Sequence, residues 1–100
     1  MYRGTTPTHT FYVDIDPELI KKIKITYSQQ DKEVIVKRTE DCTIENNAIT
    51  TRLTQEDTFQ FQCKMIVEIQ VRVLTTDGEV RTSDPLAVTV KKCLDEEVLK

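Results

Sequence analysis

The chain is poor in the residues that build linkers, reactive centres and aromatic stacks: it has no tryptophan, one histidine, two glycines and three prolines. So few glycines and prolines exclude a flexible linker or a collagen-like chain, and a hydrophobic fraction of 38% excludes a disordered tail. Alanine and leucine together number 8, whereas threonine, valine and isoleucine together number 34. Because β-branched side chains favour strands, the composition excludes a helical bundle and predicts an all-β protein.

Long apolar runs are also missing. No stretch approaches the roughly 20 apolar residues needed to cross a bilayer, and residues 1–10 lack the basic start and apolar run of a signal peptide. We therefore expect no membrane partner and a cytoplasmic location, unless the protein leaves the cell inside a particle released by lysis. A length of 100 residues suffices for one hydrophobic core, so we expect a single domain over residues 1–100.

Neither sign of charge dominates, because the net charge is −3 and acids and bases are spread evenly along the chain. A nucleic-acid-binding domain of this size is usually basic overall, so we expect no nucleic-acid partner. Local basic groups occur at Lys21, Lys22 and Lys24, at Lys37–Arg38 and at Lys91–Lys92. We interpret them as solvated outward rows of strands, since no aromatic side chain interleaves with them and edge lysines guard against edge pairing.

Alternation of apolar and polar residues, the period of a half-buried strand, recurs along the whole chain. The segments that carry it are 11–15, 22–28, 33–39, 41–44, 49–53, 67–73 and 86–91. Turn-forming residues separate them at Gln29–Lys32, Asn46–Asn47 and Asp77–Gly78. Such strands, each with one apolar face, can bury one another as two sheets, which predicts an antiparallel β-sandwich of about seven strands.

The register of the segment 33–39 is ambiguous. Val34 and Val36 are the expected inward pair, but Ile35 occupies the opposite face. Farther along, Phe59 and Phe61 follow a polar break and are expected to plug one end of the core.

The two ends of the chain lack a clear strand pattern. Residues 1–9 have no hydrophobic periodicity and are expected to form an extended N-terminal arm. Residues 92–100 are expected to form a short C-terminal tail. Leu94 and Val98 are four residues apart, which fits either one helical turn or a docked tail.

Few side chains are suited to nucleophilic catalysis or metal binding. Cys42, Cys63 and Cys93 are odd in number and show no paired spacing, so we interpret them as reduced and mostly buried thiols. A zinc site would need all three thiols to converge with His9 without a C-x-x-C motif. We place His9 at the rim of the core, and a thiol enzyme that pairs it with a cysteine stays open as a weaker alternative.

Asp14, Asp16 and Glu18 occupy alternate positions, as a cation site or a pair of catalytic carboxylates would require. We interpret them instead as solvated strand and turn residues around Pro17. The chain has no glycine-rich phosphate loop, nucleophile elbow or H-E-x-x-H motif. We therefore expect no enzyme, no catalytic, cofactor-binding or metal-binding residues, no cofactor and no small-molecule substrate.

Residues 56–63, Glu-Asp-Thr-Phe-Gln-Phe-Gln-Cys, resemble the Glu-Asp-x-Ala-x-Tyr-x-Cys corner that leads into the sixth strand of antibody variable domains. The match is partial, because the chain has no tryptophan, no cysteine in its second strand and Phe61 in place of the corner tyrosine. The resemblance supports a sandwich corner and not antibody ancestry. The expected fold is therefore an immunoglobulin-like antiparallel β-sandwich.

The chain also resembles a family of small all-β proteins, about as long as this one, from bacterial prophages and phage-like gene clusters. The matching segments are 2–11, 53–58, 69–73, 77–78 and 93–99, so the match runs from end to end. The nearest functional neighbours of that family are immunoglobulin-like domains of phage tail and baseplate proteins. The resemblance implies a structural or accessory protein in a bacterial host, associated with a virion, that acts through contacts with other phage-like structural proteins or with itself.

A small-ligand or carbohydrate-binding sandwich is the alternative function. Threonine-rich outer faces offer hydroxyl groups, but sugar stacking needs exposed aromatic side chains. The candidates are Tyr2, Tyr12 and Tyr27, of which Tyr27 has the parity of a core residue. A buried Tyr12 would remove this alternative.

Overall fold

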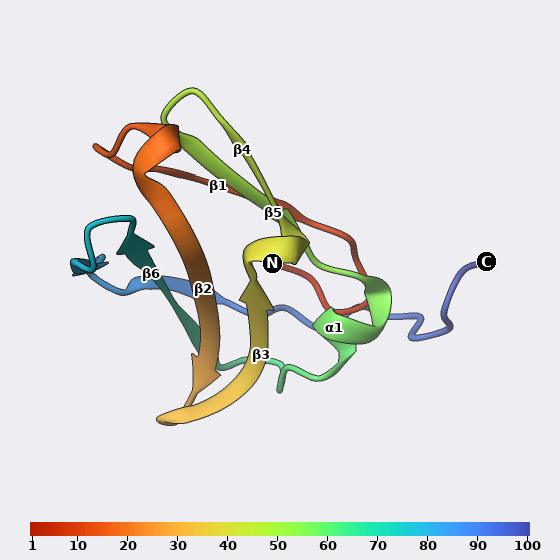
Figure 1. Ribbon diagram of the computed structural model, residues 1–100. Helices are drawn as coiled ribbons and strands as arrows, with labels where there is room; N and C mark the ends of the chain where they lie inside the picture. The colour runs from red at the N-terminus through yellow and green to blue at the C-terminus, as the bar shows by residue number, and fades with distance from the viewer.

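Two antiparallel sheets form the protein. The computed structural model describes residues 1–100 and contains eight strands, three in one sheet and five in the other (Figure 1). The expected all-β sandwich is therefore confirmed, with one strand more than predicted. Thirteen buried apolar residues, drawn from both sheets and from the segments that join them, form one core.

The larger sheet is built on two ten-residue strands, β2 (Ile20–Gln29) and β6 (Ile66–Thr75), which pair antiparallel at its centre. β3 (Lys32–Arg38) flanks β2, whereas β7 (Val80–Thr82) and β8 (Leu86–Thr89) flank β6. The inward residues of the two central strands alternate with more exposed ones and are buried, namely Ile23, Ile25, Tyr27, Val67, Ile69, Val71 and Val73. The inward rows predicted for these two strands are confirmed.

The smaller sheet has the order β1-β5-β4, with β1 at Thr8–Tyr12, β4 at Cys42–Glu45 and β5 at Ala48–Arg52. A short 3-10 helix, η2 (Thr39–Asp41), carries the chain from β3 to β4. β4 and β5 form the predicted hairpin, and Asn46 adopts a φ of 54° in its turn. Asparagine tolerates this left-handed conformation better than most residues.

The first strand ends earlier than expected. β1 stops at Tyr12 instead of running to residue 15, and Asp16 begins the 3-10 helix η1 (Pro17–Leu19) by accepting a hydrogen bond from the Glu18 N–H. Tyr12 pairs with Ala48, the first residue of β5, so the ladder has no further strand residue to pair with beyond this point. Ile15 still reaches the core from the bend before η1.

The buried residue of β3 is Ile35. Of the expected inward pair, Val34 is half-buried and packs against the core, whereas Val36 lies outside the core and its predicted orientation is wrong. A β-bulge shifts the register of the β2–β3 ladder just after Tyr27, which pairs with Ile35. Ile35 is buried and both valines are half-buried. A bulge inserts one extra residue on one strand and so changes which face the neighbouring residues occupy. The partner strand, and not the apolar run itself, therefore decides the orientation.

The polar break expected before Phe61 contains a short helix. α1 (Gln55–Phe59) begins after Thr54, whose hydroxyl accepts the Asp57 N–H at 3.1 Å while the Asp57 carboxylate accepts the Thr54 N–H at 2.9 Å. This reciprocal pair is a capping box with aspartate in place of the usual glutamate. Phe61 follows the helix and is buried, as predicted. None of the helices is long and apolar enough to cross a bilayer.

The N-terminal arm is attached to the sandwich. The Lys91 N–H donates to the Met1 carbonyl at 2.7 Å, and the Arg3 N–H donates to the Lys91 carbonyl at 3.0 Å, so the first residues run parallel to the chain that follows β8. Gly4, with a φ of +78°, then turns the arm over the Phe59 ring, which lies 2.6 Å from where a Cβ would stand. β1 begins inside the segment expected as arm.

The C-terminal tail docks and forms no helical turn. The Gln55 side chain exchanges two hydrogen bonds with the Leu99 backbone, at 2.7 and 2.8 Å, and Glu96 forms an ion pair with Arg3. The tail thus runs past α1 (Figure 1), while Leu94 projects entirely into solvent. Of the two predicted forms of the tail, the docked one is confirmed.

One edge of the larger sheet is interrupted. β7 and β8 both pair with β6 and are separated by Ser83–Pro85, which accounts for the eighth strand. The Ser83 hydroxyl accepts the Val71 N–H at 3.0 Å, and the Ser83 N–H donates to the Val71 carbonyl at 2.9 Å. A serine side chain thus replaces a backbone acceptor of the ladder at this point.

The register of β3 predicts unequal effects of two neighbouring truncations. We expect Ile35→Ala to lower the free energy of unfolding by about 2–4 kcal/mol, because it leaves a cavity in the core. Val36→Ala, on the half-buried face, should cost about 1 kcal/mol. Urea unfolding followed by circular dichroism measures both. A larger loss for Val36→Ala than for Ile35→Ala would contradict the observed register.

Candidate interaction surface

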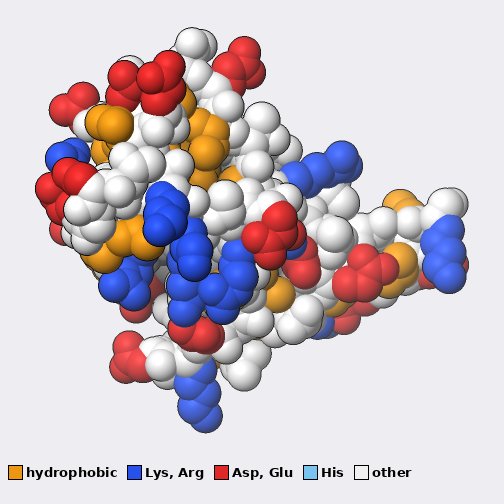
Figure 2. Space-filling model, viewed as in Figure 1, with side chains coloured by type: hydrophobic (Ala, Val, Ile, Leu, Met, Phe, Trp, Pro, Cys, Tyr) orange, Lys and Arg blue, Asp and Glu red, His pale blue; other side chains and the backbone are white.

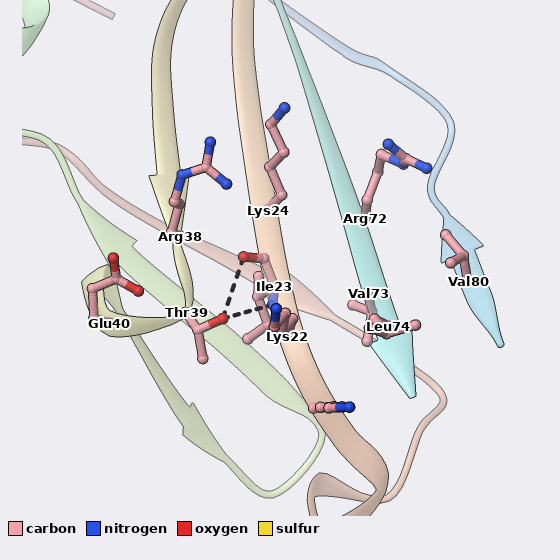
Figure 3. A pocket seen from close by; sticks show the side chains of 11 residues that line it. Lys22, Ile23, Lys24, Arg38, Thr39, Glu40, Arg72, Val73, Leu74 and Val80 are labelled. Carbon is pink, nitrogen blue, oxygen red and sulfur yellow. Dashed lines mark hydrogen bonds between the residues drawn. The ribbon is translucent and has the colours of Figure 1, made fainter. Parts of the chain in front are cut away.

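Three cations stand in register on the outer face of the larger sheet. Lys24 on β2 pairs with Arg38 on β3 and with Arg72 on β6, so the three residues, which we name the cationic row, cross three adjacent strands. Figure 3 shows their side chains on the same side of the sheet. Adjacent strands lie about 4.8 Å apart. Like charges directly opposite each other destabilise a sheet. The one carboxylate paired with the row is that of Glu33, which is exposed and lies 3.7 Å from the Lys24 Nζ, so most of this repulsion is left uncompensated.

The cationic row borders a hollow of about 550 Å³, which we name the cationic hollow. Lys21 and Lys22 bring two further positive charges to its lining, and Glu40 is the one acidic residue there. Leu74 and Val80 add apolar surface (Figure 3). In Figure 2 the blue side chains gather near the middle of the visible face. The local charge is therefore strongly positive although the whole chain is acidic.

The local basic groups noted in the sequence do not form one patch. Lys22 and Lys24 occupy the outward row of β2, as predicted. Lys37 turns the other way and its Nζ lies 2.9 Å from a carboxylate oxygen of Asp57. Lys91 lies over the Tyr2 ring, with its Nζ 5.5 Å from the ring centroid.

Sequence reasoning missed the contribution of Arg72. The signal was present, because Arg72 belongs to the outward polar row of the strand predicted at 67–73. The β2–β6 register decides that Arg72 lies beside Lys24, and this register joins positions almost fifty residues apart.

The carboxylates of the β1–β2 connection lie beside those of the β6–β7 turn. Asp14, Asp16, Asp77 and Glu79, which we name the acidic end, line a cavity of about 180 Å³ together with Arg81. Arg81 binds Glu79, with Nε 2.7 Å from the carboxylate. No group of three or more His, Cys, Asp or Glu side chains is placed to hold a metal ion.

His9 lies at the rim of the core, as predicted, and bonds to a tyrosine. Its Nδ1 is 2.7 Å from the Tyr27 hydroxyl, and both side chains face the space between the sheets. Burial lowers the pKa of His9, with a smaller contribution from the positive N-terminus, and burial raises the pKa of Tyr27. The pair is therefore a neutral hydrogen bond near pH 7.

The three cysteines form no disulfide bond. All three are free and half-buried. Burial is the main cause that raises the pKa of the Cys42 thiol, which opposes formation of the nucleophilic thiolate. The hydrogen bond of His9 goes to Tyr27, so the geometry does not supply the Cys–His pair that a thiol enzyme would use.

The aromatic candidates for sugar stacking are dispersed. Tyr12, at the end of β1, is 84% exposed. A buried Tyr12 would have removed the carbohydrate-binding alternative, so this alternative remains open. Tyr2 is half-exposed beside Lys91, and Tyr27 is buried in the core. Tyr12 is thus the one fully exposed aromatic side chain of the three.

Asp57 combines two structural roles. Burial alone would raise the pKa of its carboxyl, but hydrogen bonds from the Thr54 N–H and the Lys37 ammonium outweigh burial and hold this pKa below its ordinary value. The carboxylate thus caps α1 and neutralises a cation that would otherwise be unpaired between the sheets. Its contribution to stability is present above the ordinary carboxyl pKa and disappears as the pH falls through the lowered value.

Comparison of the chain with protein-family models, curated proteins and solved structures finds no match. The geometry of its own residues is therefore the basis for a functional proposal.

Removing the Asp57 carboxylate should destabilise the protein. We expect Asp57→Ala to lower the free energy of unfolding by about 3 kcal/mol, because the capping box of α1 loses the hydrogen bond from the Thr54 N–H and the Lys37 ammonium loses its partner. Glu56→Ala, an exposed neighbour in the same helix, should change stability by less than about 0.5 kcal/mol. Adding Lys37→Met to Asp57→Ala should recover part of the loss in urea unfolding. No recovery would show that the cap alone matters.

The lowered pKa of His9 predicts a pH dependence of stability. Between the folded and unfolded pKa values the unfolded chain binds the additional proton, so the free energy of unfolding should fall as the pH drops below about 6.5. Urea unfolding at several pH values between 5 and 8 measures this slope. His9→Gln should flatten it, while Asp84→Asn, an exposed control, should leave it unchanged. A slope that survives in His9→Gln would contradict the assignment.

Proposed function

We propose that the protein is a non-enzymatic binding module that acts through protein–protein contacts, and that its cationic row docks an acidic surface of a partner protein. The observation that carries this proposal is the register of Arg38, Lys24 and Arg72 across three neighbouring strands. A sheet that needed only a solvated face would gain stability from alternating the signs of such neighbours. Partner carboxylates would remove the mutual repulsion, and the two guanidinium groups can each bind a carboxylate through two parallel hydrogen bonds.

A protein partner fits this surface better than a nucleic acid. The charge of the whole chain is −3, so the long-range field does not attract a polyanion. The hollow has no aromatic side chain in its lining, so it offers no stacking platform for bases. Leu74 and Val80 add apolar contact area beside the cations, which is the composition of a protein-binding surface.

The proposed setting is a phage-like particle, with the module in the tail or baseplate or associated with the virion in another way. The end-to-end resemblance to prophage proteins motivates it. The sheet order supports an immunoglobulin-like fold, since β1, β5 and β4 face β3, β2, β6 and the β7–β8 edge, with a helical corner between β5 and β6. Domains of this architecture commonly serve as docking modules, although fold alone does not define function.

A carbohydrate-binding module is the second candidate, favoured by the exposed ring of Tyr12. The neighbouring Thr10 and Thr50 hydroxyls lie 3.4 Å apart on the outer face of the smaller sheet and offer polar groups. Glycan-array binding that Tyr12→Ala abolishes would support it, and an array without signal would reject it.

The docking proposal predicts charge-dependent binding of an acidic polypeptide. Poly-L-glutamate titrated into dilute, isotopically labelled protein should shift the amide resonances of β2, β3 and β6. Lys24→Glu/Arg72→Glu should weaken this binding at least about tenfold, because two of the three docking charges are reversed. Raising the salt concentration should also weaken it.

Lys92→Glu/Lys100→Glu is the matched control, because it changes the net charge equally at the C-terminal tail. It should bind poly-L-glutamate nearly as the unmodified protein does. Equal weakening by both double variants, or shifts confined to other strands, would reject the cationic row as the docking site.

A further inference from the structure

Exposed apolar side chains lie where the cationic hollow adjoins the acidic end. Leu19 and Val80 are 50% and 52% exposed, and Leu74 pairs with Val80 across the ladder. Leu19 lines the cavity of the acidic end, whereas Leu74 and Val80 line the cationic hollow. Exposed large apolar side chains at one place on a small protein mark an interaction surface.

The two charged regions are continuous along the chain. Lys21 and Lys22, which line the cationic hollow, come shortly after η1. Asp14 and Asp16, which belong to the acidic end, come just before η1. On the other side, Glu79 precedes Val80, the first residue of β7. The Thr76 N–H donates to the Leu19 carbonyl at 2.8 Å and ties the two connections together. The acidic and cationic regions are thus neighbours that meet at Leu19–Lys21 and at Glu79–Val80, with apolar residues at their boundary.

The charges of the two halves are complementary. The acidic end has four carboxylates and one cation, Arg81, while the cationic hollow has five cations and one carboxylate, Glu40. In Figure 2 acidic side chains gather along the upper and left rim, apart from most of the basic side chains near the middle. Within the chain, Glu79 pairs with Arg81 and Lys24 lies 3.7 Å from Glu33. No ion pair joins the acidic end to the cationic hollow, so the two halves do not neutralise each other within one molecule.

We propose that this surface binds a second copy of the chain in a two-fold symmetric dimer, with the acidic end of each copy against the cationic hollow of the other. This inference rests on the docking role proposed for the cationic row, and it names the partner. A two-fold rotation exchanges the two copies, so the contact between an acidic end and a cationic hollow occurs twice in the dimer. The boundary residues Leu19, Leu74 and Val80 then lie near the axis, as the apolar centre of an interface with a charged rim.

The dimer is expected to be weak and sensitive to salt. Exposed ion pairs contribute little individually, and salt screens them. The contact therefore depends on four clusters of charge acting at once, and it opens readily at high ionic strength. Reversing two charges in one half removes the charge complementarity of both contacts of the dimer, because the altered half is then close to neutral.

Sedimentation equilibrium over a wide range of protein concentration tests the proposal. The unmodified chain should associate to the mass of two chains at low salt and dissociate at about 1 M salt. Lys24→Glu/Arg72→Glu and Asp14→Lys/Glu79→Lys should each raise the dissociation constant at least about tenfold. Neither variant removes a buried group or a helix cap, and circular dichroism checks their folding; if either double variant fails to fold, Arg72→Glu and Glu79→Lys replace them.

Mixing the two charge-reversed variants provides the decisive comparison. Each alone should be monomeric, because the altered half keeps about as many charges of one sign as of the other. An equimolar mixture should form a heterodimer, because the unaltered acidic end of one variant then meets the unaltered cationic hollow of the other. Lys92→Glu/Lys100→Glu should dimerise like the unmodified chain. A mixture that stays monomeric, or masses that grow beyond two chains, would overturn the two-fold dimer.

The outcomes separate this dimer from the docking proposal. A chain that stays monomeric at every concentration but binds poly-L-glutamate through the cationic row overturns the dimer and leaves the docking role in place. A dimer that both double reversals leave intact shows that the contact uses another surface. If the unmodified chain neither self-associates nor binds poly-L-glutamate, both proposals are rejected.

Discussion

The antiparallel ladder between β2 and β6 constrains both faces of the larger sheet at once. Along each strand successive side chains point to opposite sides, so the register that packs Ile25 against Val71 also places Lys24 opposite Arg72. The inner row must be apolar because it covers the core. The outer row is free of that demand, and its charges are therefore the part of the ladder available for recognition. A slip of one residue would bury the cations and expose the core.

Polar contacts between the sheets define how the two layers meet. The bond of His9 to Tyr27 joins β1 to β2, and the pairing of Lys37 with Asp57 joins β3 to α1. Apolar packing alone tolerates small sliding of one sheet over the other, whereas a half-buried donor without its acceptor is costly. These two contacts thus act as fixed points where β1 and α1 meet the larger sheet.

Much of the fold could be predicted from the sequence, because segments such as 67–73 have one face buried and the other in water. The inward residue of β3 could not, since the bulge after Tyr27 arises from pairing with β2. The start of α1 was encoded in Thr54 and Asp57, yet the aspartate in place of glutamate concealed it. The cationic row could be predicted strand by strand but not as a row, because its assembly depends on register between distant segments.

The interrupted edge formed by β7 and β8 has a consequence for aggregation. A long uninterrupted edge offers a template on which a strand of another molecule can add, and such addition is indifferent to side-chain identity. Here the free edge is divided into segments of three and four residues, and Pro85 removes a backbone donor between them. Backbone-driven growth along this side is thereby discouraged. Association at this end of the molecule is left to side chains, which can discriminate between partners.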